Sequence, residues 1–291
     1  MENPKISIVI PTYGRAEFLK NLISSVRNST PQNAYEFVIV SSDRPESNKI
    51  KWLSQQKDTK LILSESRKKW QLRKSSLYYY INLGIKETTK EWVFVVNDDM
   101  FFDKNWYKEL KILLSNYIDG NVGMIIIATH IGDTKLGCRI IKIGKTKKND
   151  TWKDLYLSDI SIIKREVLEE IGFFDENLKW YGSGADNSMA IEFMTDKNTV
   201  LSEKIIIDHF ITNESRNVDT EDSFTDFYYL IHKWDKWCKK NNCQYVCNFG
   251  VEPYTFKNRL KHYIKRKIKI IKHYIKYLIN YILKTDNKAS N

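Results

Sequence analysis

The sequence predicts an α/β fold, in which a mostly parallel sheet is flanked by helices and followed by an amphipathic helical extension at the carboxyl end. Short β-branched runs alternate with helical patterns through the first half of the chain, and this alternation predicts the sheet. No internal repeat is visible. A lysine- and isoleucine-rich segment at the carboxyl end predicts the extension. With 291 residues, of which 42% are hydrophobic, the chain can form one large domain with an appendage.

Strands are expected where β-branched and aromatic residues cluster in short runs. These runs are Ile6–Ile10, Phe37–Val40, Leu61–Leu63, Trp92–Val96 and Val122–Ile127. Helical patterns between them cover Ala16–Arg27, Ser47–Gln56, Leu72–Lys86 and Asn105–Tyr117. Because ligands of an open parallel sheet lie beyond the carboxyl ends of its strands, the residues after each strand are the first candidates for a functional site.

The second half of the chain has a weaker pattern. After Ala128 it loosens through a stretch with glycine and lysine as far as Asp150, and it resumes with the run Leu155–Ile163. Helices are then expected near Lys164–Ile171, Asp186–Met194 and Ser223–Lys240.

The positive charge of the chain is concentrated at its carboxyl end. The formal net charge is +11, and the segment from Lys257 onward holds 11 basic residues and one acidic residue, Asp286. The tail therefore carries +10 and the rest of the chain only +1. A nearly neutral body without a basic stripe argues against nucleic acid as a partner.

Neither a membrane span nor a disulfide framework is expected. No apolar run reaches the roughly 18 to 20 residues of a spanning helix, and the amino terminus enters a strand pattern without room for a signal peptide, which predicts a cytoplasmic protein. The four cysteines lack paired zinc-site spacing, so buried or free thiols are expected at Cys138, Cys238, Cys243 and Cys247. A zinc site of the last three with His232 is the alternative.

An apolar strand that runs directly into Asn97-Asp98-Asp99 is the strongest local sign of chemistry. Mg²⁺ and Mn²⁺ prefer oxygen ligands, and they commonly join one or two carboxylates to substrate phosphates. The arrangement suits a nucleotide diphosphate. The structural alternative is a turn with solvated acids at the end of a strand.

The first strand ends in Pro11-Thr12-Tyr13-Gly14-Arg15, which could offer a hydroxyl group and a ring face to a nucleoside. A simple turn before a helix is the alternative. The segment from Ile6 to Arg15 resembles the opening of family 2 glycosyltransferases, as do Glu36–Val40 and the order of Asn82-Leu83-Gly84-Ile85 before Asn97-Asp98-Asp99. The resemblance covers roughly residues 5–215.

This resemblance implies a GT-A, Rossmann-like fold and an enzyme that moves a sugar from a nucleotide-diphosphate-sugar donor to a hydroxyl of a growing glycan or a lipid-linked acceptor. It also implies a divalent metal, Mn²⁺ or Mg²⁺. Two alternatives remain open, a catalytically inactive membrane-associated carbohydrate-binding protein and a sugar-phosphate nucleotidylyltransferase, although the latter usually has a glycine-rich phosphate loop after the first strand. The implied domains are a catalytic domain over 1–215, with a donor half 1–128 and an acceptor half 129–215, then a helical extension 216–253 and a basic tail helix 254–291.

The resemblance assigns the donor residues position by position. Thr12 and Tyr13 would contact the nucleoside, Asp98 the ribose or the metal, and Asp99 the metal. The whole donor-binding set is Pro11, Thr12, Tyr13, Arg15, Asp43, Arg73, Asn97 and Asp98, with Lys74 and Arg216 as further basic candidates for the diphosphate. Asn97 departs from a full Asp-x-Asp motif, and Ser41-Ser42 before Asp43 departs from the usual acidic strand end, so the base of the donor stays open between UDP, dTDP and GDP.

The acceptor segment resembles the family's in Ile171–Glu176 followed by Trp180–Asp186. The resemblance implies that Asp186 is the general base of an inverting transfer. Trp180 and Tyr181 lie within this segment, and because sugar rings commonly lie against aromatic faces, we expect these two residues to contact the acceptor sugar. A helix cap is the alternative role for Asp186. After the apolar run Ile205–Ile207, the resemblance implies that His209 is a third ligand of the metal or a contact of the diphosphate. An ordinary surface or core histidine is the alternative.

The tail forms an amphipathic pattern when Leu260 is set at zero on a helical wheel. One apolar sector holds Ile264, Ile268, Ile271, Ile275, Leu278 and Ile282, and the opposite face holds Lys261, Lys265, Lys269, Lys272 and Lys276. This pattern predicts that residues 257–284 lie on an anionic membrane surface, which would make the protein peripheral to the membrane. A helix docked on the protein's own body is the alternative.

Overall fold

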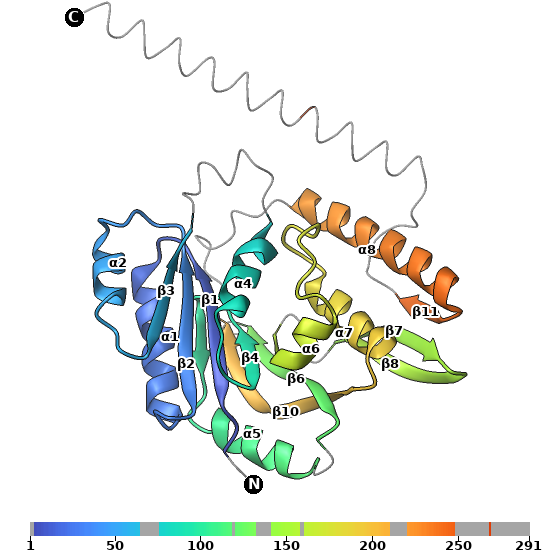
Figure 1. Ribbon diagram of the computed structural model, residues 1–291, viewed down its shortest axis with the longest axis horizontal. Helices are drawn as coiled ribbons and strands as arrows, with labels where there is room; N and C mark the ends of the chain where they lie inside the picture. Colours follow the sequence, from blue (N-terminus) through green and yellow to red (C-terminus); the bar gives the residue numbers. More distant parts are fainter. Residues whose placement is uncertain are drawn as a thin grey trace, which may run out of the picture.

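The computed structural model describes residues 3–64, 76–117, 120–131, 141–157, 160–209 and 220–247, together with Ile268. The described part forms a large central sheet, covered by helices, and a smaller sheet beside the last helix (Figure 1). The predicted tail helix, apart from Ile268, lies outside the described residues, as do Cys138, Arg73, Lys74 and Arg216. The division into domains at residues 215 and 253 stays a prediction.

The central sheet has eight strands among the described residues, in the order β3-β2-β1-β4-β9-β6-β10-β5. Their bounds are β1 Ile6–Thr12, β2 Tyr35–Ser41, β3 Thr59–Leu63, β4 Trp92–Val95, β5 Met100–Phe102, β6 Val122–Ile131, β9 Ser161–Lys164 and β10 Asn198–His209. The β3-β2-β1-β4 half is parallel, as is the β6–β10 pair, whereas β9 and β5 run antiparallel to their neighbours. The prediction of a mostly parallel sheet is therefore confirmed.

Helices cover both faces of this sheet, namely α1 Ala16–Ser29, α2 Asn48–Leu53, α4 Leu77–Lys86, α5 Trp106–Ser115, α6 Arg165–Glu170 and α7 Ser183–Met194. Helix α8 Thr220–Asn241 packs against α7. Along β1, Ile8 packs into the core with α1 and α5, and Val9 packs into the core with α4 and α6. Because side chains of a strand alternate between the two faces, β1 is apolar on both, which is why its sequence is an unbroken hydrophobic run.

Helix α1 illustrates why these segments fold as they do. It buries Leu19, Leu22, Ile23 and Val26 completely, at the spacing that places side chains on one face of a helix. Helix α4 lies so close to the sheet that a Cβ atom on Gly84 would lie 2.6 Å from Val9 Cγ1. Glycine is the residue that permits this approach.

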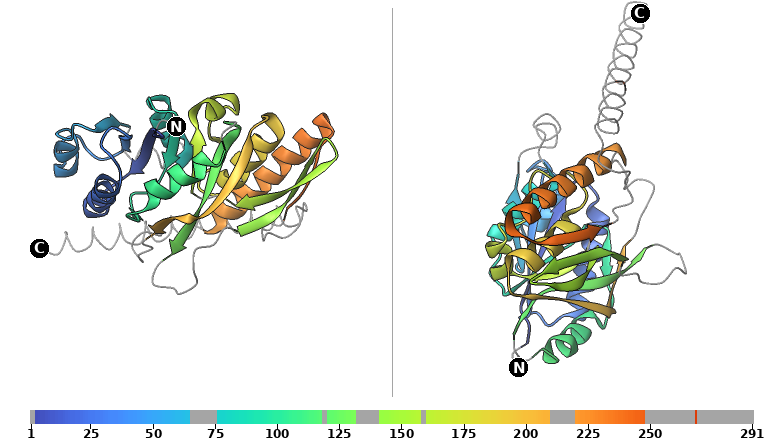
Figure 2. Two further views of the ribbon diagram at one scale, coloured as in Figure 1. Left: turned by 90° about the horizontal axis from the view of Figure 1, so that it is seen from below. Right: turned by 90° about the vertical axis from the view of Figure 1, so that its right-hand side faces the viewer.

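A second sheet, in the order β11-β7-β8, lies beside α8, as Figure 2 shows. Its strands are β7 Ile141–Lys148, β8 Thr151–Leu157 and β11 Gln244–Cys247. Helices α7 and α8 share a buried core with this sheet, in which Met189 and Trp234 lie beneath Leu155.

Several sequence-based expectations were wrong in this region. The stretch that was expected to be loose as far as Asp150 contains β7, and the run Leu155–Ile163 is divided between β8 and β9. Strands β5 and β11 were not expected. Helix α7 begins at Ser183 after an N-cap at Gly182, and not at Asp186, so Asp186 is not a capping residue. Within the described residues, no helix is both long and apolar enough to cross a membrane.

Candidate active site

The carboxyl ends of β1, β2 and β4 meet at one edge of the central sheet, where ligands of this sheet type bind. The register pairs Thr12 with Ser41 and Val9 with Val95, so the residues that follow these strands are neighbours. Strand β10 brings His209 to the same edge, where its side chain contacts Asp99. Parallel pairing thus gathers side chains that are far apart in the sequence.

Asp98 and Asp99 form the acidic centre of this edge and are almost fully buried. Thr12 Oγ1 donates a hydrogen bond of 2.7 Å to Asp98 Oδ2, and Arg15 Nη1 donates one of 2.8 Å to Asp99 Oδ2. The other guanidinium nitrogen, Arg15 Nη2, forms an ion pair with Asp98 Oδ1. On the far side, His209 Nε2 lies 3.2 Å from Asp99 Oδ1. One guanidinium group therefore bridges both carboxylates.

The two carboxylates differ in their electrostatics. Burial raises the pKa of Asp98 to about 6, although Arg15 and Thr12 oppose this effect. Burial would also raise the pKa of Asp99, but His209 and Arg15 outweigh it and hold the pKa below its ordinary value. Asp99 therefore has the lower pKa of the two carboxylates and stays ionised at a lower pH than Asp98.

Lys49, on α2, is a member of the site that the sequence did not indicate. Its side chain is only 5% exposed and forms an ion pair with Asp43 Oδ2. Its ammonium group also donates hydrogen bonds to Gly14 O at 2.7 Å and to Thr12 Oγ1 at 3.1 Å. Thr12 lies 37 positions away in the sequence, so no local pattern could have revealed the contact.

The predicted donor residue Asp43 supports the turn between β1 and α1. Its Oδ1 accepts a hydrogen bond of 3.0 Å from the backbone N–H of Gly14, and its Oδ2 accepts one of 2.8 Å from Ser41 Oγ. Among the other predicted donor residues, Pro11 lies within β1, while Tyr13 and Asn97 are exposed beyond the strand ends. The structure thus brings Thr12, Arg15, Asp43, Asp98, Asp99 and His209 together.

The proposed base, Asp186, belongs to a second cluster, which α7 and α8 build. It is 3% exposed, and Trp234 Nε1 donates a hydrogen bond of 2.8 Å to its Oδ1. Lys233 Nζ lies 2.8 Å from Asp186 Oδ2 and 2.9 Å from Asp175 Oδ2. Burial raises the pKa of Asp186, and Lys233 opposes this effect. The hydrogen bonds described for Asp186 thus lead to α8, and not to Asp98 or Asp99.

Asp226 of α8 fixes the segment that carries the two predicted acceptor residues. Its buried carboxylate accepts backbone hydrogen bonds from Lys179, Trp180 and Tyr181, at 3.0, 2.8 and 3.0 Å. The side chain of Tyr181 is exposed, and that of Trp180 is half-buried. Sequence reasoning missed Asp226 because it lies in a helix that the motifs do not cover.

The residues at the carboxyl edge fit a divalent metal that shares its ligands with a substrate. Among the described residues, no three His, Cys, Asp or Glu side chains form a ready-made metal cluster. Asp98 Oδ1 and Asp99 Oδ1 are, however, buried oxygens without a regular hydrogen bond. Mg²⁺ and Mn²⁺ typically bind one or two carboxylates and take the remaining ligands from substrate phosphates and water. Asp99, with Asp98 and His209 nearby, offers such a partial set.

The cysteines do not form a metal site in the described part of the chain. Cys238, Cys243 and Cys247 are free thiols. Burial raises the pKa of Cys247 to about 12, which keeps it protonated and unreactive. The prediction of free thiols is confirmed for these three.

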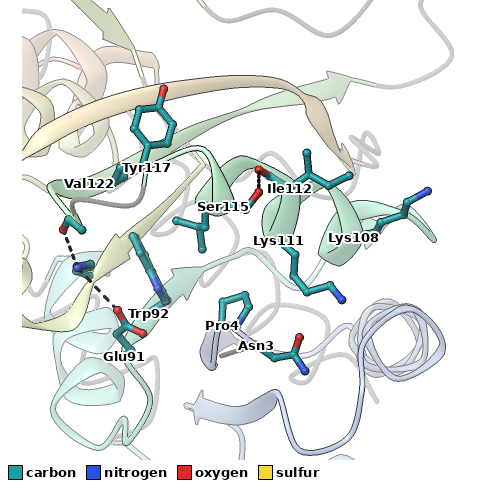
Figure 3. Close-up of a pocket in the computed structure, with 13 residues that line it drawn as sticks. Asn3, Pro4, Glu91, Trp92, Lys108, Lys111, Ile112, Ser115, Tyr117 and Val122 are labelled. Atoms are coloured by element: carbon teal, nitrogen blue, oxygen red, sulfur yellow. Dashed lines mark hydrogen bonds and ion pairs between the residues drawn. The ribbon is translucent and has the colours of Figure 1, made fainter. Parts of the chain in front are cut away.

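A cavity of about 600 Å³ lies at the opposite end of the sheet (Figure 3). It is bordered by Pro4 before β1, by Trp92 at the start of β4, by Val122 at the start of β6, and by Ile112 of α5. These positions are the amino ends of the parallel strands, away from Asp98 and Asp99. The cavity is therefore separate from the candidate site.

The comparisons with solved structures agree with the fold. The S. aureus protein TarS, residues 1–349 in complex with UDP-GlcNAc, is 16% identical, with a TM-score of 0.57 over 77% of this chain and 65% of that chain. The mannosyltransferase PcManGT of Pyrobaculum calidifontis, in complex with GDP-Man and Mn²⁺, is 15% identical, with a TM-score of 0.51 over 74% of this chain and 59% of that chain. The GT-A fold is thus confirmed.

Sequence comparison gives a curated relative and a family. The O-antigen biosynthesis protein RfbC of Myxococcus xanthus is 21% identical over 254 residues, which cover 79% of this chain and 19% of that protein. The chain therefore spans only about a fifth of the length of this relative and less than two thirds of the two solved chains. The model of "Glycosyl transferase family 2" matches residues 7–172, which is more than half of the chain. The chain accordingly belongs to glycosyl transferase family 2.

Proposed function

We propose that the protein transfers a sugar from a nucleotide-diphosphate-sugar donor to a hydroxyl of a glycan or lipid-linked acceptor, in polysaccharide biosynthesis. The observation that carries this proposal is the convergence of Thr12, Arg15, Asp98, Asp99 and His209 at the carboxyl edge of the sheet. The family and the titles of the neighbours, which name UDP-GlcNAc and GDP-Man, support it.

In this proposal the main donor residues have the roles that the family resemblance implies. Thr12 and Tyr13 contact the nucleoside, and Asp98 contacts the ribose or the metal. Asp99 and His209 hold Mn²⁺ or Mg²⁺, which when bound would neutralise charge on the leaving diphosphate. Arg15 supplies a further positive charge for that group, because a guanidinium binds phosphate oxygens through paired N–H donors.

For the transfer itself we propose an inverting reaction with Asp186 as general base. The acceptor oxygen would form a bond to the anomeric carbon while its proton passes to Asp186. The bond from the anomeric carbon to the diphosphate oxygen would break, and its electron pair would leave with the nucleotide. Each oxygen of Asp186 accepts one side-chain hydrogen bond, from Lys233 or from Trp234, and each has a second lone pair at which an acceptor hydroxyl could donate.

Calorimetric titration of the full chain with UDP-, dTDP- and GDP-sugars, with and without Mn²⁺, tests the donor proposal. Binding of one donor should require Mn²⁺ and should be lost in Asp99→Ala, whereas Asn97→Asp should tighten it. Asp150→Ala is the matched control, because its side chain is 95% exposed on the β7–β8 hairpin. Equal binding by wild type and Asp99→Ala would remove the metal role of Asp99.

Asp186→Asn tests the base. Asparagine keeps the size of the side chain but does not accept a proton at neutral pH, so turnover should fall by about 10² or more while donor affinity stays similar. Normal turnover in this variant would place the base elsewhere. A large loss of melting temperature together with normal activity per folded molecule would identify Asp186 as a structural residue of the α7–α8 contact.

The burial of Asp186 favours one second candidate function, a carbohydrate-binding protein without catalysis. In that case wild type would bind a nucleotide sugar or glycan without consuming the donor. Donor hydrolysis or transfer, followed by chromatography of the released nucleotide, separates the two functions.

We further propose that residues 257–284 bind an anionic membrane surface. Support comes from the +10 charge of the tail and from its single apolar sector.

A further inference from the structure

The guanidinium group of Arg15 lies where a cation between Asp98 and Asp99 would be expected. It contacts Asp99 Oδ2 through Nη1 and Asp98 Oδ1 through Nη2, and both carboxylates are at least 95% buried. Buried carboxylates require a counter-charge, and arginine remains charged at every physiological pH. In the described structure Arg15 thus neutralises the acidic pair.

The turn that presents Arg15 is held in place by the Asp43–Lys49 ion pair. Gly14 and Arg15 both have positive φ angles, 65° and 40°, which a non-glycine residue adopts only when its surroundings enforce it. Asp43 accepts the backbone N–H of Gly14, and Lys49 donates to the backbone oxygen of the same residue. Both polar groups of Gly14 are therefore fixed, and the direction of the Arg15 side chain is set in advance.

Arg15 occupies oxygens that a divalent metal between the two carboxylates would use. Asp98 Oδ1, which is buried and has no regular hydrogen bond, forms the ion pair with Arg15 Nη2, and Asp99 Oδ2 accepts the hydrogen bond from Arg15 Nη1. A metal that binds either of these oxygens must displace the guanidinium. Like charges at this distance also repel each other. The Arg15 side chain is 33% exposed, so it can leave the carboxylates without disrupting the buried core.

We propose that Arg15 is a resident counter-cation, which holds Asp98 and Asp99 in the empty protein and moves to the donor diphosphate when a divalent metal takes Asp99. This inference rests on the proposed function, because it assigns the metal and diphosphate to this site. It makes Arg15 a residue with two alternating partners, both of them anionic oxygens in a geometry that its planar donor groups fit.

The proposal predicts opposite effects of one substitution on two ligands. In Arg15→Gln the competing cation is absent, so Mn²⁺ alone should bind several-fold more tightly than to wild type. In excess Mn²⁺, UDP should bind the same variant several-fold more weakly, because the diphosphate loses its arginine partner. Loss of Arg15 should also lower the melting temperature of the metal-free protein, and Mn²⁺ should raise that temperature more than in wild type.

The experiment measures free Mn²⁺ by electron paramagnetic resonance during titration of the full chain, followed by calorimetry with UDP in excess Mn²⁺. Arg27→Gln is the matched control. Arg27 lies in α1, the helix that begins directly after Arg15, and it pairs with Asp58 and not with Asp98 or Asp99, so its loss should change neither affinity. If Arg15→Gln fails to fold, Arg15→Lys replaces it. A single ammonium cannot bridge both carboxylates as the guanidinium does, so this variant should also bind Mn²⁺ more tightly than wild type.

The outcomes separate this inference from the proposed function. Unchanged or weaker Mn²⁺ binding in Arg15→Gln, or in Arg15→Lys where only that variant folds, would overturn the counter-cation role even if wild type binds UDP well. Tighter Mn²⁺ binding without any nucleotide binding in either protein would support the resident counter-cation and overturn both the transfer of Arg15 to a diphosphate and the proposed donor site.

Discussion

Lys49 shows how single residues at the site depend on partners that are distant in the sequence. Its ammonium is almost completely removed from water and is stabilised by Asp43, Thr12 and the backbone oxygen of Gly14. A buried charge of this kind is stable only while its partners remain, since removal of one member leaves the other without compensation.

Lys49→Met should therefore destabilise the protein by about 3–5 kcal/mol, because Asp43 loses its counter-ion. Lys51→Met, on the exposed side of the same helix, should change stability by less than about 0.5 kcal/mol. Urea unfolding followed by circular dichroism measures both values. The double variant Lys49→Met/Asp43→Asn should lose less than the sum of the losses in the two single variants, and a double loss equal to that sum would show that the pair does not interact.

The sequence could predict those site residues that follow strands directly, and it could not predict those that reach the site from helices. Asp98 and Asp99 come after an apolar run, and Thr12 ends the first strand, so strand prediction alone places them at the carboxyl edge. Lys49 and Lys233 belong to helices in which lysine is ordinarily a solvated residue. Only the tertiary contacts with Asp43 and Asp186 distinguish them.

At the scale of elements, the burial of a strand decides whether its sequence predicts it. β1, β2 and β6 are buried on both faces and have continuous apolar sequences, which are easily identified. β7 was missed because lysines occupy many of its positions, so its sequence shows no strong apolar pattern. β5 has only three residues and follows directly after Asp98 and Asp99, where a turn was the simpler expectation.

Helix α4 offers a test of how tightly an element is packed on the sheet. In Gly84→Ala the new methyl group would meet Val9 Cγ1 at 2.6 Å and Val40 Cγ2 at 3.0 Å. The helix must move away, which should cost about 1–3 kcal/mol even though alanine is the better helix former. Thermal unfolding measures the loss, and a gain in stability would show that α4 has room against the sheet.

Two side chains of α8, Tyr229 and Lys233, hold this helix against Asp175 and Asp186, and both side chains lose their protons only at alkaline pH. Asp186 and Asp175 raise the pKa of Lys233 above its ordinary value, although burial alone would lower it. Burial and Asp175 raise the pKa of Tyr229 to about 12. Both groups keep their protons longer in the folded than in the unfolded protein. Their contribution to stability is therefore complete below the ordinary values and is lost as the pH rises above about 10.

As the pH rises from about 9 to about 11.5, the melting temperature of Tyr229→Phe should therefore fall by less than that of wild type, because the variant lacks one of the two titrating groups. Tyr79→Phe is the control, since the side chain of Tyr79 is 42% exposed. Melting temperatures recorded at half-unit pH steps give the comparison. Identical slopes in wild type and both variants would mean that the Asp175–Tyr229 contact does not contribute to alkaline unfolding.

At the scale of the whole molecule, chemistry and charge lie in different parts of the chain. The candidate donor site is built between Thr12 and His209, and the family match ends at residue 172. Almost the entire net charge lies in residues 257–291, outside the described structure. A body that holds the candidate donor site, followed by a basic tail, is consistent with the proposal that the tail binds an anionic membrane surface.

Truncation before Lys257 should leave a nearly neutral protein that retains donor binding but no longer floats with anionic vesicles. Contacts of lysine with lipid headgroups are screened within about 10 Å at 0.1 M salt, whereas buried apolar area is not. Changing Ile268, Ile271 and Ile275 together to Ser should therefore release more protein from the vesicles than added salt does. If the tail instead packs on the body, the full-length chain should not bind the vesicles, and the truncated chain should have a lower melting temperature than the full-length chain. Flotation and thermal unfolding of both chains, measured side by side, decide between these two positions of the tail.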